Sequence, residues 1–159
     1  IMEDELITGG YWSVYYYEGT IYGTEITRGL DILKLIPSEY LSENEIAAAA
    51  LAYPMIGHRR AFNPQQQVPM HWPASPEVAR AYIDQLLRDK AIDEDVADQI
   101  IEKLDQVKIE MEMGGNNRLA RQINRFNLSV EGLSADVQTK NRFERLDATL
   151  KGISESLRK

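Results

Sequence analysis

The stretch Tyr11–Leu35, YWSVYYYEGTIYGTEITRGLDILKL, decides the fold because it predicts three short β-strands joined by two tight turns. The pairs Glu18-Gly19 and Arg28-Gly29 supply those turns. Gly23, inside the second strand, leaves room for a neighbouring aromatic ring or backbone. A meander of this length buries too little apolar surface to offset the entropy lost on ordering it. We therefore expect it to lean on helices or to complete a larger sheet.

The composition sets bounds on the class of protein. The chain has 159 residues, 43% of them hydrophobic, which is enough to build a core. A formal net charge of -7 repels phosphate backbones, so nucleic acid is not expected as a partner. The absence of cysteine excludes disulfides, thiol catalysis and thiolate metal sites. No apolar run is long enough to span a bilayer, so we expect no membrane span.

After the meander, the pattern predicts one capped helix and then an irregular segment. Ser42 and Glu45 form a capping box that predicts a helix over Glu43–Tyr53. Residues 55–74 hold prolines and consecutive glutamines without a period, which predicts an extended linker on the surface. Four side chains are expected to anchor it: Phe62, Val68, Met70 and Trp72.

The remaining residues predict a helical bundle. Ser75 and Asp93 are candidate N-caps of the first two helices, and Gly114-Gly115 ends the second. Two more helices have apolar residues at helical spacing. The first carries Leu119, Ile123, Phe126, Val130 and Leu133, and the second carries Phe143, Leu146, Leu150, Ile153 and Leu157. Short connections favour antiparallel packing.

The predicted fold class is therefore α+β, mainly α. We expect an N-terminal three-stranded antiparallel β-meander over residues 1–37, followed by the capped helix in 38–54. The Pro/Gln linker, packed on the surface, occupies 55–74, and an antiparallel four-helix bundle occupies 75–159.

The segment Trp12–Leu35 resembles the last repeat of the LVIVD-repeat proteins, a bacterial and archaeal group associated with β-propellers at or outside the cell surface. The likeness rests on GTEI-x-RGLD, Gly23–Asp31, within which Gly29–Leu33 would form the signature strand. The resemblance implies the terminal blade of a propeller in a secreted or cell-surface protein. A propeller needs several four-stranded blades, so the chain departs from the family by lacking the ring. Ile1 in place of methionine predicts that the chain is an inner part of a longer polypeptide.

Residues Ala81–Leu157 resemble, less specifically, the FIMAH domains, which are small helical modules appended to extracellular bacterial proteins without assigned catalytic activity. The likeness lies in the IDQL run at Ile83–Leu86, a long amphipathic helix ending in GGNN, and a further helix carrying NRFNL. This resemblance implies a non-catalytic appendage.

Aromatic residues crowd the meander and allow two interpretations. The cluster comprises Tyr11, Tyr15, Tyr16, Tyr17 and Tyr22 with Trp12. These residues can pack against neighbouring strands, or they can form a stacking platform for sugars or peptides. We prefer burial, and the exposure of the Tyr15, Tyr17 and Tyr22 rings distinguishes the two interpretations.

Charged residues of the meander also allow two interpretations. Glu25, Arg28 and Asp31 bracket the second turn, where they can act as an acid/base group or as structural pairs that fix the strand register. We prefer the structural pairing.

The basic cluster His58-Arg59-Arg60 is a candidate site for an anion or an acidic partner surface, or simply a solvated loop. The second histidine, His71, lies outside any metal-ligand spacing with His58, so we expect both to be surface or packing residues.

No catalytic or phosphate-binding motif occurs in the sequence. We therefore predict no enzyme, no cofactor and no metal. The predicted function is a non-catalytic structural or interaction module, whose strands pair with the remainder of the polypeptide or with other protein chains. The alternative is a carbohydrate- or peptide-binding module that uses the tyrosine and tryptophan cluster.

Overall fold

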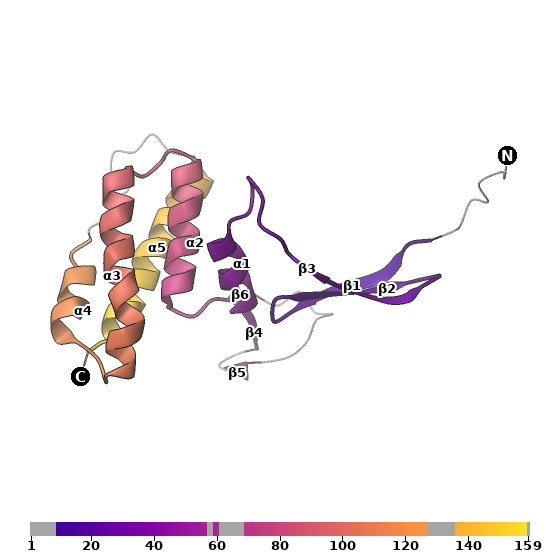
Figure 1. The fold of residues 1–159 in the computed structure, drawn as a ribbon, viewed down its shortest axis with the longest axis horizontal. Helices are drawn as coiled ribbons and strands as arrows, with labels where there is room; N and C mark the ends of the chain where they lie inside the picture. The colour runs from indigo at the N-terminus through magenta and orange to yellow at the C-terminus, as the bar shows by residue number, and fades with distance from the viewer. Residues whose placement is uncertain (1–8, 57–58, 61–68, 127–135, 159) are drawn as a thin grey trace.

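A computed structural model describes residues 9–56, 59–60, 69–126 and 136–158. It is mixed α+β and mainly helical, with a sheet projecting from a helical body (Figure 1). The strands are β1 (Tyr11–Tyr17), β2 (Thr20–Glu25), β3 (Gly29–Lys34), β4 (Tyr53–Ile56), β5 (Arg59–Arg60) and β6 (Met70–His71). The helices are α1 (Glu43–Ala50), α2 (Pro76–Arg88), α3 (Glu94–Glu112), α4 (Asn117–Ile123) and α5 (Val137–Ser156).

The N-terminal sheet confirms the predicted meander, because β1, β2 and β3 pair antiparallel in sequence order. The first turn has positive φ angles at both Glu18 and Gly19, of 46° and 80°, which is the geometry that a two-residue hairpin turn requires. Gly29, with φ of 95°, follows the second turn. The register places Tyr15 opposite Tyr22, and Tyr22 opposite Ile32.

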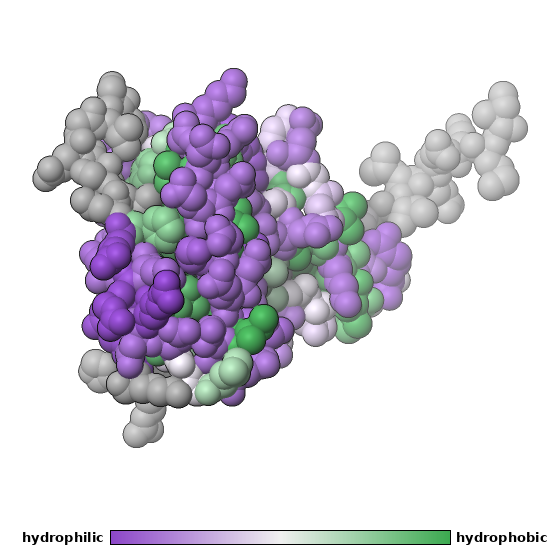
Figure 2. Space-filling model, turned by 60° about the vertical axis from the view of Figure 1, so that its left-hand side comes forward, coloured by the Kyte–Doolittle hydropathy of each residue, from purple (hydrophilic) through white to green (hydrophobic). Residues whose placement is uncertain are grey.

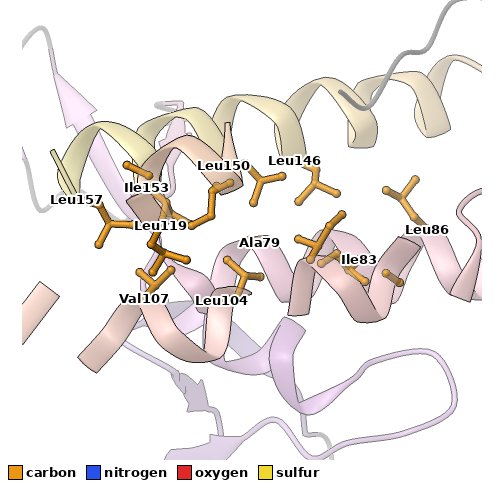
Figure 3. Close-up of a cluster of buried hydrophobic side chains, with 14 of the residues drawn as sticks. Ala79, Ile83, Leu86, Leu104, Val107, Leu119, Leu146, Leu150, Ile153 and Leu157 are labelled. Carbon is orange, nitrogen blue, oxygen red and sulfur yellow. The ribbon is translucent and has the colours of Figure 1, made fainter. Parts of the chain in front are cut away.

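Helices α2 to α5 share one hydrophobic core (Figure 3). Their fully buried side chains interleave between the helices, which run alternately up and down in Figure 1. The predicted N-caps Ser75 and Asp93 each accept a hydrogen bond from the first turn of their helix. Gly115 donates its backbone N–H to the Glu110 carbonyl and closes α3, as the Gly-Gly pair predicted.

Helix α1 packs against α2 through polar and apolar contacts. The Ser42–Glu45 capping box is present, as predicted. Asn44 donates a hydrogen bond to Asp84 of α2 over 2.9 Å, and Glu45 forms an ion pair with Arg88. A small apolar cluster lies beside these contacts, formed by Ala48, Val78 and Ala81. Helix α1 is therefore fixed to the helical body.

The predicted end of this first helix at Tyr53 is wrong, because α1 ends at Ala50 with Leu51 as its C-cap. Tyr53 precedes Pro54, and a residue before proline is disfavoured in the helical region. Tyr53 is extended instead and pairs with His71.

The described parts of residues 55–74, predicted as an extended linker on the surface, contribute short strands. Strand β4 pairs antiparallel with β5 on one side and β6 on the other, forming a second small sheet. Of the expected anchors, Met70 and Trp72 are 43% and 46% exposed. Phe62 and Val68 lie outside the described residues.

Helix α4 is shorter than the predicted helix that reached Leu133. It ends at Ile123, where the chain tightens into a turn in which Phe126 donates its N–H to the Ile123 carbonyl. Phe126 still packs against the shared core. Val130 and Leu133 lie outside the described residues.

Candidate functional site

The N-terminal sheet carries large hydrophobic side chains that the described residues leave uncovered. The most exposed are Trp12 at 77%, Ile32 at 62%, Val14 and Leu30 at 57%, and Leu33 at 47%. Figure 2 shows hydrophobic residues at the sheet end of the molecule, whereas the helical surface turned toward the viewer is mostly hydrophilic. A contiguous exposed apolar patch of this kind often marks an interaction site, whereas single apolar residues scattered over a surface do not.

One face of this sheet holds three of the five tyrosines predicted as a platform. Tyr15 and Tyr22 are register partners, and Tyr17 lies two residues further along β1, so the three side chains share a face. Tyr15 and Tyr22 are half-buried and Tyr17 is 43% exposed. Ile32, the register partner of Tyr22, extends the same face. The preferred expectation that these rings are buried is therefore not met within the described chain.

The opposite face is organised around Gly23. The ring of Tyr11 lies over this glycine, where a Cβ would come within 2.5 Å of the ring. The Tyr11 hydroxyl donates a hydrogen bond of 2.6 Å to Asp31, the register partner of Gly23. The room that Gly23 was expected to provide is thus filled by an aromatic ring, and this contact ties β1 to β3 across β2.

Glu25 closes the second turn. Its carboxylate accepts backbone N–H bonds from Gly10 at 2.9 Å, Thr27 at 2.8 Å and Arg28 at 2.6 Å. These donors, with that of Gly10 the strongest, lower the pKa of Glu25 to about 2 from its ordinary 4.5. Among the described residues, Glu25 is the one charged side chain that is buried.

Arg28 joins the two carboxylates of this turn. Its guanidinium lies 2.8 Å from Asp31 and 3.9 Å from Glu25. The hydrogen bonds from Tyr11 and Arg28 also lower the pKa of Asp31. These ion pairs join residues three positions apart at the turn, whereas the prediction was a pair between facing strands that fixes the register. Both carboxylates stay ionised at neutral pH, where neither is poised to exchange a proton.

The sheet meets the rest of the protein at its first turn. A Cβ on Gly19 would lie 3.2 Å from the Cβ of Ala50, at the end of α1. Beside this contact is a cavity of about 560 Å³, lined by Tyr16 and Tyr17 from the sheet and by Leu51 and Pro54 from the other side. The junction is therefore narrow and incompletely filled, and it leaves both faces of the sheet open.

The basic cluster predicted at residues 58–60 is not joined to this sheet. Arg59 and Arg60 form β5, which pairs with β4, and their side chains lie outside the description. His58 lies outside the described residues altogether. His71 stacks on Tyr53 with ring centroids 6.2 Å apart, which fits the packing role expected of it.

The described residues contain neither a metal-binding cluster nor a membrane-spanning helix. Within them, no group of three or more histidine, aspartate or glutamate side chains is placed to hold a metal ion. No helix in the same part of the chain combines the length and apolar character needed to cross a bilayer.

Sequence reasoning missed two features that depend on tertiary packing. The Tyr11–Asp31 hydrogen bond requires the register of all three strands, and only the glycine at position 23 signalled a close approach. Tyr82 and Arg145 come together between α2 and α5, where they line two adjoining cavities. No local motif marks that pair.

The chain was compared with models of protein families, with curated proteins and with solved structures, and none of the three comparisons found a match.

Proposed function

We propose that this chain is a non-catalytic interaction module whose N-terminal sheet completes a larger β-structure. The missing strands come from the remainder of the same polypeptide or from another protein chain. In this proposal the sheet is the terminal blade of a secreted or cell-surface, propeller-like assembly, and the helices form an appendage to it.

The observation that carries the proposal is the exposure of both sheet faces. Leu30 and Ile32 on one face, and Val14 and Leu33 on the other, each keep about half or more of their surface in contact with solvent. A single covering helix would protect only one face. Packing between other sheets covers both, which is how a sheet with large apolar residues on each side is usually stabilised.

The edges of the sheet support the same proposal. Within the described residues, β1 and β3 each pair only with β2, so their outer sides present unpaired backbone groups. Such edges accept further strands readily. The Glu25 turn and the Tyr11–Asp31 bond hold the three strands in register before any partner arrives, which lowers the entropic cost of association.

The substitution Ile32→Lys tests the proposal by comparing two contexts. In the isolated chain Ile32 is 62% exposed, so a lysine should lower the free energy of unfolding of the sheet by no more than about 1 kcal/mol. In the complete polypeptide or complex, purified from cells that make it, the same lysine would be buried without a partner and should destabilise the assembly by several kcal/mol.

The matched control is Gln106→Lys, on the exposed side of α3. It adds the same charge to the helical body and should be neutral in both contexts. Thermal unfolding of the two variants in each context gives the comparison. If Ile32→Lys is as neutral as Gln106→Lys in the complete protein, the sheet has no covering partner and the proposal fails.

A second candidate function has one specific observation in its favour. Tyr15, Tyr17 and Tyr22 share a face and remain partly exposed, as a platform for carbohydrates or peptides requires. Titration of the isolated chain with soluble oligosaccharides, followed by tyrosine and tryptophan fluorescence, tests it. Binding that is lost in Tyr22→Ser would support the platform, and an unchanged spectrum throughout the series would reject it.

A further inference from the structure

Helices α2 and α5 line a groove to which the N-terminal sheet contributes no residue. Tyr82 of α2 and Arg145 of α5 both line two cavities, one of about 490 Å³ and one of about 330 Å³. Because they share these two residues, the cavities adjoin, and we call them together the Tyr82–Arg145 groove. Along α5 the groove extends from Gln138 to Thr149.

The length of this groove suits an extended peptide. The helix rises about 16 Å between Gln138 and Thr149, at its usual rise per residue. An extended chain covers that distance with about five residues. Gln138, Asn141 and Arg145 follow one another at helical spacing along the larger cavity, so they present polar groups in a single row.

Three arginines line the larger cavity, and two of them form ion pairs with carboxylates. Arg88 forms an ion pair with Glu45, and Arg142 forms one with Asp89. Arg145 is exposed and makes no ion pair with any carboxylate of the described residues. In a chain with a net charge of -7, this leaves a local positive charge in a groove of an otherwise acidic protein.

Tyr82 provides an independent sign of that charge. Burial raises the pKa of the Tyr82 hydroxyl, and the positive charge of Arg145 acts in the opposite direction. The guanidinium and the phenol hydroxyl thus lie near each other in the groove, where an anion would find both a charge and a hydroxyl donor.

Large apolar side chains form part of the lining of the smaller cavity. Trp72 and Met70 line it and are 46% and 43% exposed, and Val78 of α2 forms part of its wall. A single apolar side chain placed there would cover hydrophobic surface that now contacts solvent. Arg145 lines one end of this cavity, and Ala148 and Thr149, about one helical turn further along α5, line it as well.

We propose that the Tyr82–Arg145 groove binds an extended segment of a partner protein through an aspartate or glutamate on Arg145 and an apolar side chain against Trp72 and Met70. Residues i and i+2 of an extended chain point the same way and are about 7 Å apart, close to the rise of one helical turn from Arg145 to Thr149 along this cavity. The recognised element is thus an acidic residue followed two positions later by an aromatic or aliphatic one. This inference does not depend on the role of the sheet.

The probe is the blocked pentapeptide Gly-Asp-Gly-Phe-Gly, titrated into the isotope-labelled full chain and followed by amide chemical shifts. A Kd on the order of 1 mM is expected for so short a ligand. The signals that move should belong to residues that line both cavities, including the indole N–H of Trp72. Two control peptides replace Asp by Asn and Phe by Ala, and each should bind at least about tenfold more weakly.

Variants of the protein complete the test. Arg145→Gln should weaken the pentapeptide about tenfold or more, and Arg145→Lys, which keeps the charge, should retain most of the affinity. Arg121→Gln removes an exposed arginine from α4 and should leave binding unchanged. Equal binding of the Asp and Asn peptides would overturn the proposal, as would a complete absence of shifts. Tighter binding of inorganic phosphate at Arg145 would overturn it as well, because the groove would then be a simple anion site.

Discussion

Two alanine substitutions, one in the helical core and one in the N-terminal sheet, compare the stability contribution of a buried side chain with that of an exposed one. Leu146 is 0% exposed and lies in the core shared by α2 to α5. Leu146→Ala should therefore lower the free energy of unfolding of the helices by about 3 kcal/mol, within the usual range for fully buried leucines. Truncation of a fully buried isoleucine to alanine removes three carbons and lowers the free energy of unfolding by about 2.4 kcal/mol. Ile32, however, is 62% exposed. The partial burial reduces the expected loss to about 1 kcal/mol, confined to the sheet.

The assay is denaturant unfolding of the isolated chain, with far-ultraviolet circular dichroism for the helices and nuclear magnetic resonance signals of β2 for the sheet. Leu146→Ala should move the helical transition to lower denaturant without a change of slope. Ile32→Ala should leave that transition within about 0.5 kcal/mol of the unsubstituted chain. If Ile32→Ala lowers helical stability as much as Leu146→Ala does, the sheet and the helices share one core, and the reasoning from exposure is refuted.

Three further predictions concern the turn, the α5 contact and the α1 cap. Glu25 has a pKa of about 2 in the folded sheet against 4.5 ordinarily, so its contribution to sheet stability is complete above about pH 4.5 and is lost as the pH falls toward 2. The β2 signals should weaken over that window in the unsubstituted chain and vary less with pH in Glu25→Gln; an identical pH profile for both would contradict this role. Gly152→Ala should destabilise the chain despite the better helix propensity of alanine, because the new Cβ would lie 2.5 Å from the Cβ of Ala74. In an Ala74→Gly background the same substitution should stabilise by up to about 1 kcal/mol, and thermal melts that show no sign reversal would reject the clash. Ser42→Ala removes the cap of α1 and a hydrogen bond to Asp84, and should cost about 1 to 2 kcal/mol by chemical denaturation, whereas a neutral result would show that the cap contributes nothing.

The sequence predicted most of the secondary structure because the signals for it are local. Turn glycines fixed the ends of the strands, and the cap residues Ser42, Ser75 and Asp93 marked where helices begin. Each of these residues bonds to backbone within a few positions of itself, so its role can be inferred without the rest of the fold.

The errors arose where packing at a distance decides the outcome. Tyr53 pairs with His71, and that strand contact replaced the last turn of the predicted helix. The helix expected to reach Leu133 has its described end at Ile123, although Phe126 keeps the apolar spacing and the core contact that suggested a longer helix. Periodicity detects a buried face and does not establish that the backbone stays helical along it.

Among the candidate sites, contacts between residues close in the sequence could be predicted, and contacts between distant segments could not. Glu25 and Arg28 could be paired from the sequence, because a short turn joins them. The Tyr11–Asp31 bond needs the full strand register, and the Tyr82–Arg145 groove needs two helices separated by more than sixty positions to lie side by side. No spacing within one segment encodes either arrangement.

Amide hydrogen exchange of the isolated chain, compared with that of the complete polypeptide or complex, tests the central claim most directly. In the isolated chain the amides of β2, the middle strand, should exchange orders of magnitude faster than those of Ile83 and Leu150 in the helical core, because the residues that the structure describes form no layer over the sheet. In the complete protein the β2 amides should become protected to a degree similar to the helices. Protection of β2 in the isolated chain equal to that of Leu150 would contradict the account.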